Sequence, residues 1–454
     1  PNMSSQRVLV CLCGLVTLIL PVLATFRGIE GNYCLQRGRG DECCRGRIDE
    51  CSVPILGTMC YCDVFCNRTN SDDCCPDYWE VCLGLEPIRP TRPPEDLKSC
   101  YHNGKYYSFG ETAMINCNKC KCSLSSNYPA QTEFLCETNR CIIEDDLINA
   151  VNAAQLGWSA SNYSKFYGKT LNDGLLYKTG TLEPEVSVKR MFPIQKNYDP
   201  SSIPRSFDSR TKWPGKIQAV MDQGWCGSSW AFSTVSLASD RLAIQSEGNE
   251  ILHLSPQNLL SCNNRGQRGC EGGYLDRAWN HFRKYGVVEE RCYPYLSGYT
   301  GTIESCQIPH RANTFQLECD GQRIQMNKKD DIHYAQPAYR ISENANDIMH
   351  EIMTSGPVQA TVRVHHDLFL YKNGIYHPSN MSPTDRTSYH SVRIIGWGEE
   401  YINDYPEKYW LIANSWGEDW GENGFFRVRR GTGVIDVEKF VIAVWMESLQ
   451  SKRQ

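Results

Sequence analysis

Three side chains with the chemistry of acyl transfer occur far apart in the second half of this 454-residue chain. Ser229 offers a hydroxyl nucleophile, His390 an imidazole base, and Asn414 an amide that could orient the imidazole. Taken singly, each has a plain structural explanation. A lone histidine in a strand-like run usually has a structural role, and Asn-Ser-Trp could form a turn. Their order, spacing and flanking residues together indicate a site.

The flanks are distinctive. They read Gln223-Gly-Trp-Cys226-Gly-Ser-Ser229-Trp230, then Glu271-Gly272-Gly273 directly after Cys270, then Asn414-Ser-Trp416-Gly. This combination resembles the papain-like cysteine peptidases, with Ser229 at the position of the catalytic cysteine. The resemblance implies that His390 and Asn414 are the base and its orienting partner, and that Gln223 donates to the oxyanion. It also implies that Gly272, Gly273 and Trp416 line the substrate cleft.

The serine at position 229 predicts an inactive site. A papain-type thiol, with an ordinary pKa near 8.5, becomes a thiolate beside the imidazolium and a helix N-terminus. A serine hydroxyl ionises far higher, and serine enzymes deprotonate it during attack with a site built for oxygen. Loss of a triad nucleophile costs roughly 10⁶ in turnover, and we expect a loss of that order. The alternative is a residual hydrolase acting through Ser229.

Two kinds of element must position these residues. Residues 203–447 form the papain-like domain, and Pro204 to Arg210 resembles the mature N-terminus of that family. A helix is predicted after Ser228, because apolar residues recur at helical spacing until Gly248. Short β-rich runs follow, separated by Gly and Asn, at 359–364, 391–397, 409–413 and 425–428. The prediction is an α+β, two-lobed papain-like fold, with a helical lobe and a β-barrel-like lobe.

The 24 cysteines indicate further modules before this domain. Ten of them fall between Cys34 and Cys82, and their spacing resembles a somatomedin B domain over 33–83. A Pro-rich linker is predicted over 84–98. Six more cysteines mark a module at 99–142 that resembles a von Willebrand factor C domain. Its CxxC could instead bind zinc, but no histidine partners are nearby. Residues 144–200 resemble a cathepsin B propeptide, with one helix at 144–154.

The N-terminal residues point to the secretory route. An apolar run from Val8 to Ala24 after Arg7 predicts a signal peptide at 1–24, with a signal anchor as the alternative. The cysteine clusters are then disulfides rather than metal sites. Glycosylation sequons begin at Asn67, Asn162 and Asn380.

A tripeptide in the first cysteine cluster suggests adhesion. Arg39, Gly40 and Asp41 lie between Cys34 and Cys43, in the form that integrins recognise. The plain alternative is a solvated charged loop.

The order of modules resembles the tubulointerstitial nephritis antigen family. The resemblance implies a secreted glycoprotein of the extracellular or pericellular matrix that acts in adhesion or ligand presentation. Its partners would be extracellular matrix proteins, integrins or a secreted signalling ligand. A further alternative to the hydrolase is that the protein carries such a ligand outside cells. It also implies the disulfides Cys226–Cys270, Cys262–Cys306 and Cys292–Cys319.

Several classes of function are excluded or unsupported. A net charge of −5 does not indicate nucleic-acid binding. No segment after the predicted signal peptide approaches membrane-spanning length. No cofactor is expected. No metal site is expected either, since His365-His366 lacks a third ligand. The stretch from Leu296 to Ser342 carries no family pattern beyond its cysteines.

Overall fold

The computed structural model describes residues 29, 31–37, 43–46, 50–55, 58–67, 73–85, 99–125, 131–382, 386–402 and 404–448. The chain divides into two compact units, residues 1–113 with 120–135 and residues 114–119 with 136–454. The predicted signal peptide, the Arg39-Gly40-Asp41 tripeptide and nearly all of the predicted linker lie outside the described residues. No helix in the described part is long and apolar enough to cross a membrane.

Disulfides organise the N-terminal module. Its regular elements are short: β1 (Ser52–Ile55), β2 (Thr58–Tyr61) and α1 (Tyr78–Val81). Its buried apolar residues are mainly half-cystines, with Ile55 and Tyr78 among the few others. The burial of so few apolar residues cannot offset the conformational entropy that the chain loses on folding, so disulfides must stabilise the module. The bridges are Cys34–Cys62, Cys43–Cys82, Cys44–Cys51, Cys60–Cys75 and Cys66–Cys74.

Small antiparallel sheets follow. Strands β3 (Ser99–His102) and β4 (Lys105–Ser108) pair as a hairpin. Strands β5 (Thr112–Ile115), β6 (Asn118–Leu124) and β7 (Thr132–Cys136) form a three-stranded sheet. Bridges Cys100–Cys122 and Cys117–Cys141 hold this region.

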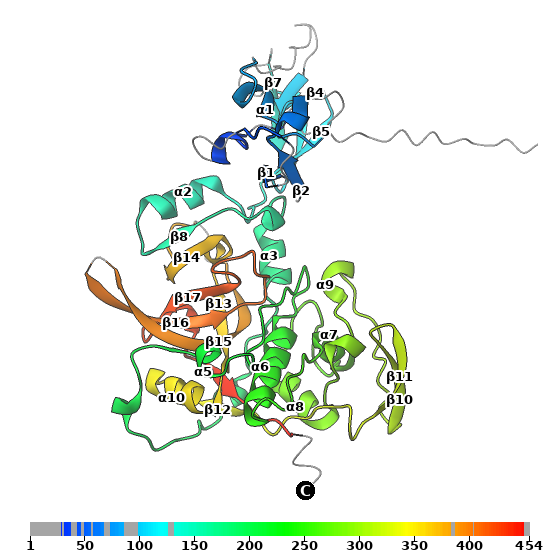
Figure 1. Ribbon diagram of the computed structural model, residues 1–454, viewed down its shortest axis with the longest axis vertical. Coiled ribbons are helices and arrows are strands. Elements are labelled where there is room, and N and C mark those ends of the chain that lie inside the picture. The colour runs from blue at the N-terminus through cyan, green and yellow to red at the C-terminus, as the bar shows by residue number, and fades with distance from the viewer. Residues whose placement is uncertain are drawn as a thin grey trace, which may run out of the picture. The chain divides into compact units, whose positions relative to one another are not determined.

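The large unit has a helical lobe around one buried helix. Helix α6 (Ser229–Gln245) packs on α7 (Pro256–Cys262) and α8 (Leu275–Tyr285) on one side, and on strands of the sheet on the other (Figure 1). Its small residues allow this close approach from both sides, and its side chains from Ser229 to Ala243 are buried. The predicted helix is therefore found, and it ends three residues before Gly248. The unit also contains α5 (Ser209–Lys212), α9 (Ser297–Thr300) and α10 (Ala345–Ser355), of which α5 and α10 contact strands of the sheet.

The strand-rich lobe is an open nine-stranded sheet. The main path runs β12-β18-β13-β15-β16-β17-β14-β8, with β9 paired to β15. The strands are β8 (Trp158–Ala160), β9 (Phe207–Asp208), β12 (Tyr339–Ile341), β13 (Val358–Val364), β14 (Tyr371–Tyr376), β15 (Ser388–Ile402), β16 (Tyr405–Ala413), β17 (Phe425–Arg429) and β18 (Val441–Ala443). A separate hairpin joins β10 (Thr314–Cys319) to β11 (Gln322–Asn327).

The two-lobed α+β prediction is confirmed, and the strand-rich lobe is an open sheet rather than a closed barrel. Strands β12 and β8 stand at opposite ends of the path, and in the described residues they do not pair with each other. Each is only three residues long. The sheet therefore stays open.

The propeptide-like segment is built into the core of the large unit. It contains α2 (Asp145–Ala153), β8, α3 (Leu171–Tyr177) and α4 (Val186–Lys189). Strand β8 extends the main sheet by pairing with β14. Trp158, Phe166 and Leu171 belong to the same buried apolar cluster as the strands. Only the helix at 144–154 was expected here, because the other elements are too short to show periodicity.

Truncating a core side chain of this segment tests its structural role. Phe166 is fully buried and its ring contacts those of Trp225, Phe369 and Trp416. We expect Phe166→Ala to lower the free energy of unfolding of the large unit by about 3–5 kcal/mol. The control is Phe192→Ala in the same segment, since this ring is 97% exposed and its loss should change stability by less than about 0.5 kcal/mol. Urea denaturation followed by tryptophan fluorescence measures both. Equal effects would show that the segment merely lies on the surface.

Candidate functional site

Ser229 is held by hydrogen bonds that do not involve a base. It is the first residue of α6 and is fully buried. Its Oγ lies 2.9 Å from the hydroxyl of Thr181, and accepts a hydrogen bond from the backbone N–H of Ser391 at 3.3 Å. Thr181 belongs to the propeptide-like segment. A nucleophile must bond to its general base before attack, whereas this hydroxyl bonds to a threonine, which cannot act as one.

His390 and Asn414 form the pair that the resemblance implies. His390 lies on β15, and Asn414 directly follows β16, which pairs with β15. The imidazole Nε2 lies 2.7 Å from Oδ1 of Asn414. That oxygen also accepts from the N–H of Ser415, so Nε2 carries the proton and donates it. The other ring nitrogen, Nδ1, is buried and has no hydrogen-bond partner in the described part of the chain.

The imidazole of His390 is neutral near pH 7. Burial lowers its pKa to about 4, and the cation of Lys178 acts in the same direction, against the hydrogen bond to Asn414. A thiolate at position 229 would stabilise the protonated ring, as in papain-type enzymes. Ser229 provides no such charge, so desolvation decides the protonation state.

Gln223 and the start of α6 form a pair of converging donors. The carbonyl oxygen of Thr179 accepts a hydrogen bond from Nε2 of Gln223 at 3.0 Å and from the backbone N–H of Ser229 at 3.3 Å. Oε1 of Gln223 accepts from the hydroxyl of Ser415, which fixes the orientation of the amide. Converging donors of this kind stabilise an oxyanion during acyl transfer. Here they are used by a carbonyl of the protein itself.

The predicted cleft edge is also occupied. The N–H of Leu182 donates to the carbonyl of Gly273 at 2.9 Å, and the N–H of Gly273 donates to the carbonyl of Gly180 at 3.0 Å. At Gly272, the neighbouring edge residue, an added Cβ would lie 3.2 Å from Cδ2 of Leu182. The indole N–H of Trp416 donates to the carbonyl of Lys178. Residues 178–182 therefore lie along the predicted cleft edge, and Thr181 forms a parallel β-bridge with Gly273.

Close approach at Gly180 explains why the segment fits so deeply. Its φ is +109°, and an added Cβ would lie 2.1 Å from backbone atoms of Gly227. No L residue with a side chain fits there without displacement. Sequence reasoning missed Thr179, Gly180 and Thr181, because nothing in Lys178-Thr-Gly-Thr181 marks it as a cleft-binding peptide.

Three disulfides cross-link the papain-like domain. The structure joins Cys226 to Cys270, beside both Ser229 and the cleft edge. It also joins Cys262 to Cys306 and Cys292 to Cys319. These are the three pairings that the resemblance implied.

The structure also places two of the predicted sequons and His366. Asn162 and Asn380 are exposed, as glycosylation requires, while the side chain of Asn67 lies outside the described residues. His366 is buried, with Nε2 2.8 Å from the carbonyl of Ile142, and so has a structural role. The described residues contain one close group of potential metal ligands, Cys34, Cys62 and Cys75, and all three are disulfide-bonded.

Comparisons with known proteins extend these observations. The model of the papain cysteine protease family matches residues 203–445. The human protein named tubulointerstitial nephritis antigen-like is 43% identical over 438 residues, covering 93% of this chain and 90% of that protein. Human tubulointerstitial nephritis antigen is 38% identical, covering 92% and 87%. Among solved structures, procathepsin B S9 of Trypanosoma congolense matches with a TM-score of 0.56 and 26% identity, covering 68% of this chain and 99% of that one.

The neutral, buried His390 makes a testable contribution to pH dependence. Its pKa is about 4 in the folded state against 6.5 ordinarily, so between these values the unfolded chain binds a proton that the folded chain does not. The contribution is complete above pH 6.5 and is lost as the pH falls toward 4. From pH 7.5 to pH 4.5, we expect the free energy of unfolding to fall by about 2–3 kcal/mol more in the unaltered protein than in His390→Gln. Urea titrations at both pH values measure this difference, and parallel losses would contradict it.

Proposed function

Because the chain belongs to the papain family of cysteine proteases and, along nearly its whole length, to the tubulointerstitial nephritis antigen family, we propose that it is a secreted, non-enzymatic binding glycoprotein of the extracellular matrix. It acts in cell adhesion or in presenting a ligand. The observation that carries the proposal is the hydrogen bond of Ser229 Oγ to Thr181, a residue of the segment that fills the cleft.

Two independent features oppose peptide hydrolysis. The nucleophile position holds a hydroxyl, which does not form a stable ion pair with an imidazole as a thiol does. In addition, both oxyanion donors bond to the carbonyl of Thr179. A substrate would have to displace residues 178–182 and would still meet no thiolate. Binding through other surfaces needs neither change.

Cysteine usage supports the extracellular location. All 22 cysteines in the described part of the chain are disulfide-bonded. Disulfides on this scale form and persist in oxidising compartments. The apolar run at 8–24 and the exposed sequons at Asn162 and Asn380 are consistent with passage through the secretory route.

A peptidase assay tests the inactive cleft. We expect no turnover of a dipeptidyl fluorogenic substrate by the unaltered protein, because it lacks a thiolate. Ser229→Cys supplies the thiol, and adding Gly180→Ala displaces the segment, since the new Cβ would collide with the backbone of Gly227. The double variant should cleave at least about tenfold faster than Ser229→Cys alone.

The matched control combines Ser229→Cys with Gly215→Ala. Gly215 also has positive φ, but an added Cβ there meets nothing within 4 Å. This control should behave as Ser229→Cys alone. Turnover by the unaltered protein within tenfold of the double variant would refute the non-enzymatic assignment.

Adhesion through Arg39-Gly40-Asp41 is tested separately. Asp41→Glu keeps the charge but moves the carboxylate by one methylene, which disrupts its ligation to the metal of an integrin. We expect cell attachment to a surface coated with the variant to fall severalfold. The control is Glu42→Asp, the reverse change one residue away. Unchanged attachment to Asp41→Glu would remove integrins from the proposal.

A further inference from the structure

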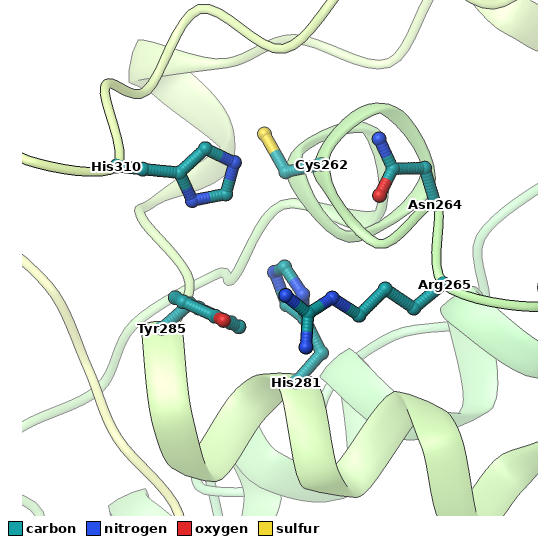
Figure 2. Close-up of a pocket in the computed structure, with 6 residues that line it drawn as sticks. All are labelled: Cys262, Asn264, Arg265, His281, Tyr285 and His310. Atoms are coloured by element: carbon teal, nitrogen blue, oxygen red, sulfur yellow. The ribbon is translucent and has the colours of Figure 1, made fainter.

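A pocket on the helical lobe lies apart from the residues of the cleft. Its volume is about 330 Å³. Figure 2 shows its six lining residues: Cys262, Asn264, Arg265, His281, Tyr285 and His310. A second pocket of about 190 Å³ shares Cys262, His281, Tyr285 and His310, and is also lined by Lys284 and Lys328. We call the two together the histidine pocket.

A disulfide links two walls of the histidine pocket. Cys262 at the end of α7 is bridged to Cys306, four residues before His310. This bridge ties the loop that carries His310 to α7. Tyr285, the last residue of α8, lies with its ring 5.5 Å from that of His310. A site with fixed walls loses little conformational entropy when it binds a ligand.

The floor of the pocket holds a donor without a partner. His281 is 7% exposed, and its ring packs 5.0 Å from that of Tyr285. In the described part of the chain, no hydrogen bond engages either nitrogen of this imidazole. Burial, together with the nearby His310, lowers its pKa to about 4, so the ring is neutral near pH 7 and carries one N–H. Because His281 lines the cavity, this N–H is available to a ligand there.

The surroundings of the pocket are cationic. Arg265 and Lys284 are exposed at its rim, and Lys328 donates a hydrogen bond to the carbonyl of His310 at 3.1 Å. None of these three cations forms an ion pair within the described residues, and no carboxylate lines either pocket. Unpaired cations around a cavity of this kind attract an anion.

We propose that the histidine pocket binds a sulfate or phosphate ester carried on a saccharide ring. The guanidinium of Arg265 matches the paired oxygens of such an ester, and Lys284 adds a point charge. The N–H of His281 donates to the ligand at the floor, and the face of Tyr285 packs on the sugar. The volume suits one or two sugar units. This inference is independent of the proposed function of the cleft.

Calorimetry on the full-length secreted protein tests the assignment. The probes are a sulfated disaccharide, the same disaccharide without sulfate, and a phosphorylated monosaccharide. We expect at least one of the charged probes to bind at least tenfold more tightly than the uncharged one, with affinity that falls as salt rises. The tighter charged probe identifies which ester the site takes.

Variants place the binding in the pocket. Arg265→Ala with Lys284→Ala should weaken binding at least tenfold, and because both side chains are exposed the fold should persist. The control pair, Arg323→Ala with Lys372→Ala, removes the same charge from exposed positions that do not line the pocket, and should change affinity less than twofold. Three results would overturn the proposal. They are equal affinities of the two variant pairs for the charged probe, equal affinities of the unaltered protein for the charged and uncharged probes, and binding that requires a divalent cation.

Discussion

The cleft is filled by the protein itself because two hydrogen-bond donors bind the carbonyl oxygen of Thr179. Gln223 Nε2 and the N–H of Ser229 converge on this atom, and the same segment continues to Thr181, which forms a parallel β-bridge with Gly273. The geometry is that of an oxyanion site, yet its donors are satisfied by the protein itself. Because these contacts are intramolecular, they form at no cost in translational entropy, and a peptide from outside must compete with them.

A serine instead of a cysteine at position 229 is compatible with a cleft that residues of the protein itself fill. A thiolate would favour a protonated His390, since opposite charges at short range raise the pKa of an imidazole. With serine in its place, burial lowers that pKa to about 4 and the ring stays neutral. A neutral ring and a hydroxyl bonded to Thr181 can both be buried without an unpaired charge. The side chains of Ser229, His390 and Thr181 are thus buried in the interior of the protein.

Much of the architecture could be predicted from the sequence, since local signals were strong. Helical spacing after Ser228 predicted α6, and the β-rich runs predicted the centres of β13, β15, β16 and β17. Short elements were missed. Helix α3 has a local signal, because Thr170 and Asp173 form a capping box, but seven residues are too few for a periodic pattern. The open sheet could not be foreseen, because closure depends on which strands lie at its ends.

The sequence by itself determined the residue types of the site, the missing thiol and the even clusters of cysteines. Each of these depends on atoms present or absent, or on spacing along the chain. Only the tertiary structure decided that Thr179 and Thr181 occupy the cleft and that His281 faces a cationic pocket. Those contacts join residues about 50 positions apart or bring together separate loops, and their distances follow from packing rather than from any local pattern.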